Sequence, residues 1–509
     1  MGKNYILSHD LGTTGNKATL YDREGNLVAS SFYSYPTYYP YPNWVEQDPS
    51  EYWKAIKISN QELLSKGKVN GKEIAVISFS GQMMGCLPVD KDGNPLRNII
   101  IWADQRGVNE AGLIKEKLGE ENVYRITGHR ISPTYSAAKI LWMKKNEPDV
   151  FSKTYKFLLA KDFIIYKLTS KWVTDFSDAS GTNLFDLQQE KWSEEIIEAL
   201  EIPIDKLPEV HSSLEVVGEL TQEASGELDL PSGIPIVIGG GDGACAACGA
   251  GVVREGEAYN YLGASSWIAI ASTRPIYDPN FRTFTFHHLA PGLFMPTGTM
   301  QSAGLSYQWA RDNLAVKEKE IALTLGISPY EIMDLEVEKI PPGSENLMFL
   351  PYLLGERSPH WNPKARGVFI GLTPRHTRTH LMRAVLEGVG LNLKIILDAF
   401  LSQGIDIKSI RLIGGGGKSR VWASILAGIF EKEVLRMEIL EEATSLGSAI
   451  AGGVGVGIFP NLNVVETLVK VKERFLPKRE DIETYRRLYS IFMETYERLV
   501  PVFDRLGGE

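Results

Sequence analysis

The sequence predicts an α/β protein with two lobes of related build. Short apolar runs alternate with glycine-rich turns and longer amphipathic stretches, a pattern typical of α/β proteins. The chain has 509 residues, and at roughly 100–200 residues per domain this length predicts about two to four units. A strand–loop–strand unit at the start of the chain has a partial copy near its middle. Together these observations favour two α/β lobes.

The opening unit is predicted to be antiparallel. Apolar segments at residues 5–8 and 17–21 flank a turn at residues 10–15, and a second turn at residues 22–26 leads to a strand at residues 27–30. Turns of this length that contain Asp and Gly between apolar runs favour hairpins. A Rossmann domain is therefore excluded, since its first strand leads into a helix.

A helix start and two strand–glycine loop–helix segments follow. Asp48 before Pro49 predicts the helix start, because Asp is a favoured N-cap and Pro is favoured in the first turn. Residues 236–243 end in Gly-Gly-Gly-Asp-Gly before a helix of small residues. Residues 410–419 contain four consecutive glycines before an apolar helix. Small residues at such points permit close approach of the backbone to a ligand.

The partial copy of the opening unit consists of strands at residues 258–262 and 267–271 around a small polar loop. We place the lobe boundary near residue 250, which gives an N-terminal lobe of residues 1–250 and a C-terminal lobe of residues 251–509. The charged segment after Pro477 has helical periodicity and predicts a final helix that returns across the second lobe.

Composition excludes several classes of function. The chain has 54 Lys and Arg residues against 63 Asp and Glu residues, a net charge of -9, so it lacks the basic field that holds nucleic acid. Three cysteines cannot form a disulfide framework, which fits the reducing cytoplasm. No apolar run approaches the roughly 18 residues that a membrane span needs. We therefore expect a cytoplasmic protein with no nucleic-acid or membrane partner.

The turn at residues 10–15 has the chemistry of a phosphate and Mg²⁺ site. It offers the carboxylate of Asp10, the hydroxyls of Thr13 and Thr14, and glycine amides. Carboxylates bind hard cations, while hydroxyls and N–H groups bind phosphate oxygens. A plain hairpin turn explains these residues equally well.

The glycine run at residues 414–417 fits neither common nucleotide motif. A Walker A loop would need glycine where Leu412 stands, and a dinucleotide fingerprint that starts at Gly414 would need glycine where Ser419 stands. Two interpretations remain: a glycine surface against which a nucleoside lies, and a strand–helix crossover without a ligand.

Asp242 is a candidate general base. A carboxylate in a glycine loop at the end of a strand is exposed and positioned for proton transfer. The alternative is a helix N-cap, the commoner role of Asp before a helix. Cys245 and Cys248 lack further ligands for a tetrahedral zinc set, which favours a buried helix face for both.

Several motifs of the chain, in this order, resemble those of the FGGY family of carbohydrate kinases, and within it most closely the xylulokinase-like branch. The match spans nearly the whole chain. The motifs lie at residues 10–14, 44–49, 80–83, 102–106, 139–142, 351–359, 367–372 and 380–387. The resemblance implies a two-lobed actin-like ATPase fold of the ribonuclease H-like type, with mixed sheets flanked by helices and the active site in the cleft between the lobes.

The resemblance also implies an ATP-dependent kinase that uses Mg²⁺, acts on a small sugar and forms a homodimer. Asp242 would be the catalytic base, and Asp10 together with Asp242 would organise Mg²⁺. The residues that would bind ATP are Gly12, Thr13, Thr14, Gly263, Ser265, Gly304, Gln308, Gly415, Gly416 and Ser419. Those that would bind the sugar are Gln82, Met83, Met84, Asp104 and Asp242.

Three positions depart from the family pattern. Met84 stands where xylulokinases usually carry His, and Gly243 where they usually carry Asn. Both changes remove polar groups that would contact sugar hydroxyls, which weakens the match to D-xylulose. Ala264 replaces the usual Thr of the second phosphate loop, where Ser265 or Ser266 would supply the hydroxyl.

The expected substrate is a pentulose such as xylulose, or a related ketose or polyol. Two alternatives stay open: a kinase for a sugar acid such as gluconate, and a non-catalytic actin-like or chaperone-like ATPase. The second alternative requires neither Asp242 nor a sugar pocket.

Overall fold

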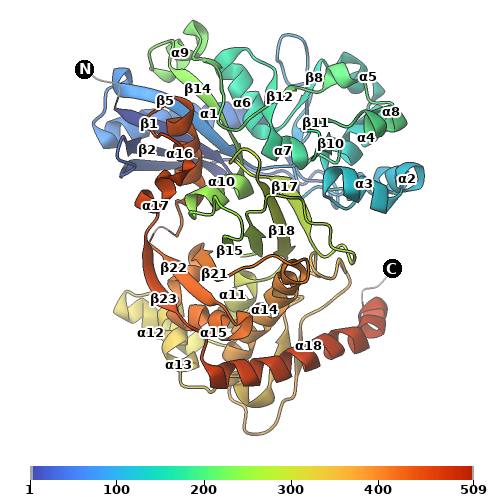
Figure 1. Ribbon diagram of the computed structural model, residues 1–509, viewed down its shortest axis with the longest axis vertical. Helices are drawn as coiled ribbons and strands as arrows, with labels where there is room; N and C mark the ends of the chain where they lie inside the picture. The colour runs from blue at the N-terminus through green and yellow to red at the C-terminus, as the bar shows by residue number, and fades with distance from the viewer. Residues whose placement is uncertain (1–3, 439, 507–509) are drawn as a thin grey trace.

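The structure, a computed structural model that describes residues 4–438 and 440–506, contains one large sheet in each half of the chain (Figure 1). The first sheet has the strand order β13-β14-β5-β1-β2-β3. Its strands are β1 (Tyr5–Leu11), β2 (Gly15–Asp22), β3 (Leu27–Ser34), β5 (Ile74–Gly81), β13 (Val216–Glu219) and β14 (Pro235–Gly241). The antiparallel opening unit is confirmed, because β1 pairs with β2 and β2 with β3 in antiparallel fashion.

The second sheet has the order β17-β18-β16-β15-β21-β22-β23. Its strands are β15 (Ala258–Leu262), β16 (Ser266–Ile270), β17 (Phe284–His287), β18 (Phe294–Met300), β21 (Ser409–Ile413), β22 (Glu433–Met437) and β23 (Val471–Phe475). From β18 to β23 the pairings are antiparallel twice, parallel twice and antiparallel once. The first sheet has the same sequence of pairings from β3 to β13. The related build of the two halves is therefore confirmed.

Helices cover both faces of the first sheet. Helix α1 (Pro49–Gly67) packs on β2 and β3, and α6 (Ala160–Thr169) packs on β5 and β14. Helix α1 begins as predicted, since the Asp48 side chain accepts from the Ser50 N–H. The opposite face carries α16 (Ala443–Gly455), which comes from the second half of the chain and lies beside α10 (Asp242–Gly249).

Glycines allow α10 and α16 to approach closely. A Cβ at Gly249 would lie 1.7 Å from the carbonyl oxygen of Ala443, and one at Gly447 would lie 1.8 Å from that of Cys245. Only glycine fits at such distances. Cys245 and Cys248 are free and fully buried in this layer, which confirms the buried helix face. The apolar core here joins residues of both sheets.

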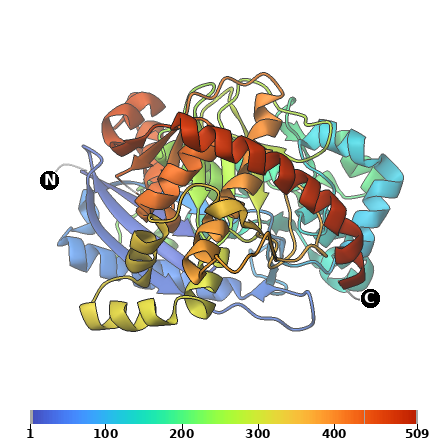
Figure 2. The same ribbon diagram turned by 90° about the horizontal axis from the view of Figure 1, so that it is seen from below.

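The second sheet is covered on its outer face by α14 (Arg378–Leu401) and α15 (Arg420–Phe430). The final helix is confirmed as α18 (Arg479–Leu506), which packs on α15 and runs across the second lobe (Figure 2). Helices α11 (Gly304–Asn313), α12 (Val316–Leu325) and α13 (Pro329–Val337) complete this side. No helix in the described ranges combines the length and apolar character needed to traverse a lipid bilayer.

The remaining elements are short and decorate mainly the first lobe. The helices are α2 (Val108–Leu118), α3 (Glu120–Thr127), α4 (Ser136–Asn146), α5 (Pro148–Lys153), α7 (Phe176–Ser180), α8 (Glu194–Leu200), α9 (Gln222–Leu228) and α17 (Val465–Leu468). The paired short strands are β4 (Glu46–Gln47) with β7 (Ile99–Ile100), β6 (Leu87–Val89) with β8 (Lys156–Leu158), β9 (Val173–Asp175) with β12 (Glu209–His211), β10 (Phe185–Asp186) with β11 (Lys191–Trp192), and β19 (Met348–Leu350) with β20 (Val368–Ile370).

Candidate active site

Two aspartates lie at the same edge of the first sheet. Asp10 is near the carboxyl end of β1, and Asp242 directly follows β14. These strands flank β5 and run parallel to it, so their carboxyl ends meet at one edge. Ligands of open α/β sheets bind at such an edge.

Asp242 is the first residue of α10, whose N-cap is Gly241. The N-cap interpretation of Asp242 is therefore wrong. Its Oδ1 accepts a hydrogen bond from the Gly243 N–H at 2.7 Å. Burial, and then the negative charge of Asp10, raise the pKa of Asp242 to about 7. A carboxylate with that pKa is suited to general-base chemistry near neutral pH.

Asp10 has a carboxylate oxygen available for a ligand. Its Oδ1 is buried and has no hydrogen-bond partner among the described residues. Burial raises the pKa of Asp10, while the nearby Ser80 hydroxyl and the charge of Lys17 act in the opposite direction. An unpaired buried carboxylate oxygen is costly unless a cation or donor meets it.

The donor set at this edge fits Mg²⁺. Within residues 4–438 and 440–506, no group of three or more His, Cys, Asp or Glu side chains is placed to hold a metal ion. Mg²⁺, however, commonly binds through one or two carboxylates together with substrate phosphates and water. The unpartnered oxygen of Asp10 and the nearby Asp242 supply carboxylates of that kind.

A cavity of about 150 Å³ opens beside Asp242. Its walls are mostly aromatic and thioether side chains, with a few hydroxyls and one guanidinium. The lining residues are Met83, Met84, Trp102, Asp242, Gly243, Ser265, Trp267, Phe284, Phe286, Met295, Thr297, Thr299 and Arg357. Three of the residues predicted to bind sugar, Met83, Met84 and Asp242, thus meet at one cavity.

The other two predicted sugar residues, Gln82 and Asp104, do not line this cavity. The amide nitrogen of Gln82 donates to Gln47 Oε1 at 2.8 Å and to Tyr52 Oη at 3.1 Å. Gln82 is 2% exposed, and its Oε1 has no partner among the described residues. Its place is behind the cavity wall, among side chains of the first lobe.

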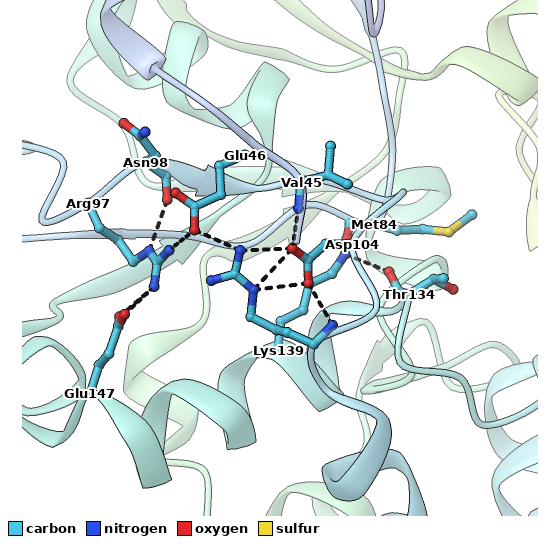
Figure 3. Close-up of polar contacts among 10 residues, drawn as sticks. Val45, Glu46, Met84, Arg97, Asn98, Asp104, Thr134, Lys139 and Glu147 are labelled. Carbon is cyan, nitrogen blue, oxygen red and sulfur yellow. Dashed lines mark hydrogen bonds and ion pairs between the residues drawn. The ribbon is translucent and has the colours of Figure 1, made fainter. Parts of the chain in front are cut away.

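Asp104 is fully buried in an ion network (Figure 3). Its Oδ1 accepts from the N–H and Nε of Arg106 at 2.9 and 3.0 Å, and its Oδ2 accepts from Arg106 Nη2 at 2.8 Å and from the Val45 N–H at 2.5 Å. Arg106 also donates to Glu46 at 2.7 Å. Both carboxylate oxygens of Asp104 are therefore occupied by protein donors.

Met84 has a left-handed backbone held by a buried lysine. Its φ is 63°, a conformation that is strained for residues other than glycine. Lys139 Nζ donates to the carbonyl oxygens of Met84 and Thr134, each at 2.6 Å (Figure 3). Burial lowers the pKa of Lys139 to about 7. The sequence assigned no role to this lysine, which fixes the segment that carries Met83 and Met84.

A second cavity, of about 210 Å³, lies on the other side of Asp10. Its lining includes four residues of the predicted phosphate turn at residues 10–15, namely Asp10, Gly12, Thr14 and Gly15, and also Lys17 and Glu441. Lys17 Nζ lies 3.3 Å from Glu442 Oε1. The sequence analysis missed Lys17; the available signal was a basic residue on the strand directly after the turn.

Thr13 points away from this second cavity. Its Oγ1 accepts from Trp102 Nε1 at 2.9 Å, and Trp102 lines the cavity beside Asp242. The turn at residues 10–15 therefore connects the two cavities, since Asp10, Gly12 and Thr14 face one and Thr13 supports a wall of the other.

The second phosphate loop and the predicted adenosine residues meet at the second sheet. The Gly304 N–H donates to the Gly263 carbonyl at 2.8 Å, and a Cβ at Gly304 would lie 2.3 Å from that oxygen. A Cβ at Gly416 would lie 2.5 Å from Leu262 Cγ, whereas one at Gly415 would have no atom within 4 Å. Gly415 thus presents an open backbone surface next to the loop.

Ser265 and Ser266 have different surroundings. Ser266 is buried and donates to the Tyr261 carbonyl at 2.6 Å, whereas Ser265 lines the cavity beside Asp242. Of the two hydroxyls considered for this loop, that of Ser265 is the one at the site.

The last two residues predicted to bind adenosine are Gln308 and Ser419. Gln308 is exposed on α11. Ser419 caps α15, accepting from the Trp422 N–H at 3.0 Å. A groove of about 790 Å³ lies beside α13 and α15, and none of the predicted ATP residues is among its lining side chains.

The sequence analysis also missed most of the walls of the sugar-side cavity. Phe284, Phe286 and Thr297 come from β17 and β18, far along the chain from residues 82–106. Trp102 and Arg357 lie within motifs already noted for the resemblance, at residues 102–106 and 351–359. Their position within these motifs was the only sequence signal for Trp102 or Arg357.

Comparisons with known proteins identify the family of the chain. The model of the FGGY family of carbohydrate kinases matches residues 5–249 with its N-terminal domain and residues 258–456 with its C-terminal domain. A xylulose kinase of Staphylococcus epidermidis is 34% identical over 98% of this chain and 97% of that protein. A gluconokinase of Bacillus licheniformis is 32% identical over 99% and 98%.

Solved structures extend the agreement to the fold. The ligand-bound xylulose kinase from Lactobacillus acidophilus superposes with a TM-score of 0.91 at 29% identity and covers 98% of this chain and 99% of that chain. The fold class predicted from the sequence is confirmed. The two family matches and the full-length relatives show that the chain belongs to the FGGY family of carbohydrate kinases.

Proposed function

We propose that this kinase transfers the γ-phosphate of ATP to a hydroxyl of a small sugar bound in the cavity of about 150 Å³, with Asp242 as the general base. One observation carries the proposal. Asp242 lines the sugar-side cavity and also feels the charge of Asp10, which lies at the phosphate turn. A base in this position reaches both the acceptor hydroxyl and the phosphoryl group.

The residues of this chain would have the following roles in phosphoryl transfer. Asp242 accepts the proton of the sugar hydroxyl as its oxygen attacks the γ-phosphorus and ADP departs. Backbone amides at residues 13–14 and 264–265 and the ammonium of Lys17 would surround the phosphate oxygens, which is the electrostatic part of phosphoryl transfer. Mg²⁺, held by Asp10 and Asp242, would neutralise charge on the phosphates when bound.

A pentulose such as xylulose is the first candidate for the acceptor. The walls formed by Trp102, Trp267 and Phe284 offer apolar faces for the C–H surface of a sugar ring or chain. Met84 has an apolar side chain and Gly243 has none, so neither offers a side-chain hydrogen bond to a sugar hydroxyl. Relatives named xylulose kinase support this candidate.

A sugar acid such as gluconate is the second candidate, on a separate observation. Arg357 lines the cavity, and its guanidinium forms no ion pair with any side chain in the described part of the chain. A guanidinium next to a substrate can bind a carboxylate with two parallel hydrogen bonds. A relative named gluconokinase supports this candidate.

Substrate-dependent release of ADP tests the proposal. Purified protein with Mg-ATP is offered ketopentoses, polyols, aldoses and aldonates in parallel. Strong release with one compound, lost in Asp242→Asn, supports the kinase and identifies the acceptor. Release with aldonates alone would select the second candidate. Nucleotide binding without acceptor-dependent release across the whole panel would contradict the proposal and favour a regulatory ATPase.

The pH dependence of catalysis should report Asp242. Because its pKa is raised to about 7 and only the ionised form accepts a proton, kcat/KM should be constant above this pH and fall about tenfold per unit below it. The measurement is kcat/KM for the sugar between pH 5 and 9 at subsaturating ATP. Residual activity of Asp242→Asn should lack this limb. A profile that stays flat down to pH 5, as an ordinary carboxyl pKa of about 4 would give, would contradict the assignment.

A further inference from the structure

We propose that Ser177 is a positioning residue for the base: its hydroxyl ties the peptide N–H of Gly241, which immediately precedes Asp242, to the buried carboxylate of Asp175. This inference rests on the proposed role of Asp242 and adds a residue behind it that touches neither sugar nor nucleotide. Ser177 lies on the short helix α7, which packs against β14.

The hydrogen bonds form a continuous chain. The Gly241 N–H donates to Ser177 Oγ at 2.9 Å. Ser177 Oγ in turn donates to Asp175 Oδ2, which also accepts from the Ser177 N–H at 2.9 Å. Ser177 and Asp175 are both 0% exposed. In this arrangement the Ser177 hydroxyl accepts from the Gly241 N–H and donates to the Asp175 carboxylate, so the direction of both hydrogen bonds is fixed.

The end of β14 needs such an anchor because it carries no side chains. Gly239, Gly240 and Gly241 precede the base, and the pairing of β14 with β5 shifts register between Val237 and Gly240. Glycine backbones are conformationally free and have no side chain of their own to restrain them, so groups packed against them must do so; a Cβ at Gly241 would lie 2.6 Å from Met83 Sδ. The space above them is nonetheless filled, since a Cβ at Gly240 would lie 2.7 Å from Ser177 Oγ.

Asp175 is itself held firmly. Lys161 Nζ lies 3.1 Å from Asp175 Oδ1, 2.9 Å from Asp162 Oδ1 and 3.3 Å from Asp178 Oδ2, and all four side chains are fully buried. Burial opposes the charge of Lys161, but the three carboxylates raise its pKa well above the usual value. Burial raises the pKa of Asp178 well above its usual value, so this group stays neutral, and the buried contacts of Lys161 with Asp175 and Asp162 hold the Asp175 side chain. The base is thus connected through one hydroxyl to a rigid part of the lobe.

The alternative is that Ser177 only stabilises the fold, and the chain contains a matched control for it. Ser213 Oγ donates to the same Asp175 Oδ2 at 2.8 Å and is also buried. Its side chain makes no hydrogen bond to the turn before Asp242. Ser177→Ala and Ser213→Ala therefore each remove one buried hydroxyl from the same carboxylate oxygen, and only the first releases Gly241.

The experiment compares kcat, both KM values and Mg-ATP binding in the two variants and the native protein, with the acceptor identified by the substrate panel. Displacing a reacting group by about 1 Å can cost about 10²-fold, so we expect kcat of Ser177→Ala to fall by about 10- to 100-fold. Its KM values, nucleotide binding and the midpoint of its pH profile should stay at the native level. Ser213→Ala should match it in thermal stability and keep the native kcat.

Equal kcat values for the two variants would overturn the inference, as would a loss in Ser177→Ala that appears only in KM. If Ser177→Ala does not fold, Ser177→Cys against Ser213→Cys carries the same comparison, because the slightly larger thiol leaves no cavity and is a weak hydrogen-bonding group. Failure of the proposed function looks different: the native protein itself would phosphorylate nothing in the panel.

Discussion

Asp242→Asn is expected to lower kcat for sugar phosphorylation by about 10²–10⁴-fold, the usual contribution of a positioned general base. The amide keeps the size of the side chain and an oxygen that can accept from the Gly243 N–H, a bond of 2.7 Å in the native protein. It cannot take the proton of the acceptor hydroxyl. The loss should therefore lie in the chemical step, and the affinity for nucleotide should change little.

Coupled measurement of ADP release gives kcat, and calorimetric titration with Mg-ATP gives the affinity. Asp92→Asn is the matched control, since Asp92 is an exposed aspartate of the same lobe, and it should behave as the native protein does. Turnover of Asp242→Asn above about a tenth of the native rate would exclude Asp242 as the base. Loss of nucleotide binding without a loss in kcat would indicate that Asp242 acts by holding Mg²⁺.

Local sequence was sufficient to locate the strand ends that carry this chemistry. Strand, glycine loop and acidic residue are consecutive around Asp10 and Asp242, so periodicity and turn residues alone predicted that both lie at the end of a strand. The twofold similarity of the sheets was also visible, because the β15–β16 unit keeps the small polar loop of the β1–β2 unit.

The walls of the cavity could not be predicted in this way. They depend on which distant strands are neighbours: Phe284 and Phe286 reach Asp242 only because β17 and β18 extend the second sheet at one end. The same limit applies to Ser177, whose hydroxyl meets Gly241 across 64 residues of sequence. Motif resemblance pointed to Asp242 as the candidate base, yet gave no account of what holds it.

Asp104 shows what a motif leaves open about contact. It lies within the motif at residues 102–106, and the resemblance implied that it binds the sugar. In the fold its carboxylate pairs with Arg106, whose guanidinium lies 3.8 Å from the ring centre of Trp44. This pairing predicts a structural role for Asp104, which the following variant tests.

Asp104→Ala is accordingly expected to destabilise the protein by about 3–5 kcal/mol, the range for breaking a buried ion pair by removing one partner. The Arg106 side chain is 0% exposed and would keep only Glu46 as an anionic partner, and its Nη1 already lacks a hydrogen-bond partner in the described part of the chain. The Val45 N–H would also lose its acceptor. Denaturant unfolding followed by tryptophan fluorescence measures the loss.

Glu121→Ala is the control for Asp104→Ala, because it breaks an exposed pair in which Arg125 and Glu121 are 71% and 69% exposed; it should cost about 1 kcal/mol or less. Asp104→Ala combined with Arg106→Leu should recover part of the stability, since no buried charge is then left alone. The opposite pattern, native stability with a raised KM for the sugar, would mean that Asp104 contacts the substrate directly. A structural role of Asp104 would therefore appear as a change in the free energy of unfolding, and a substrate contact as a change in KM.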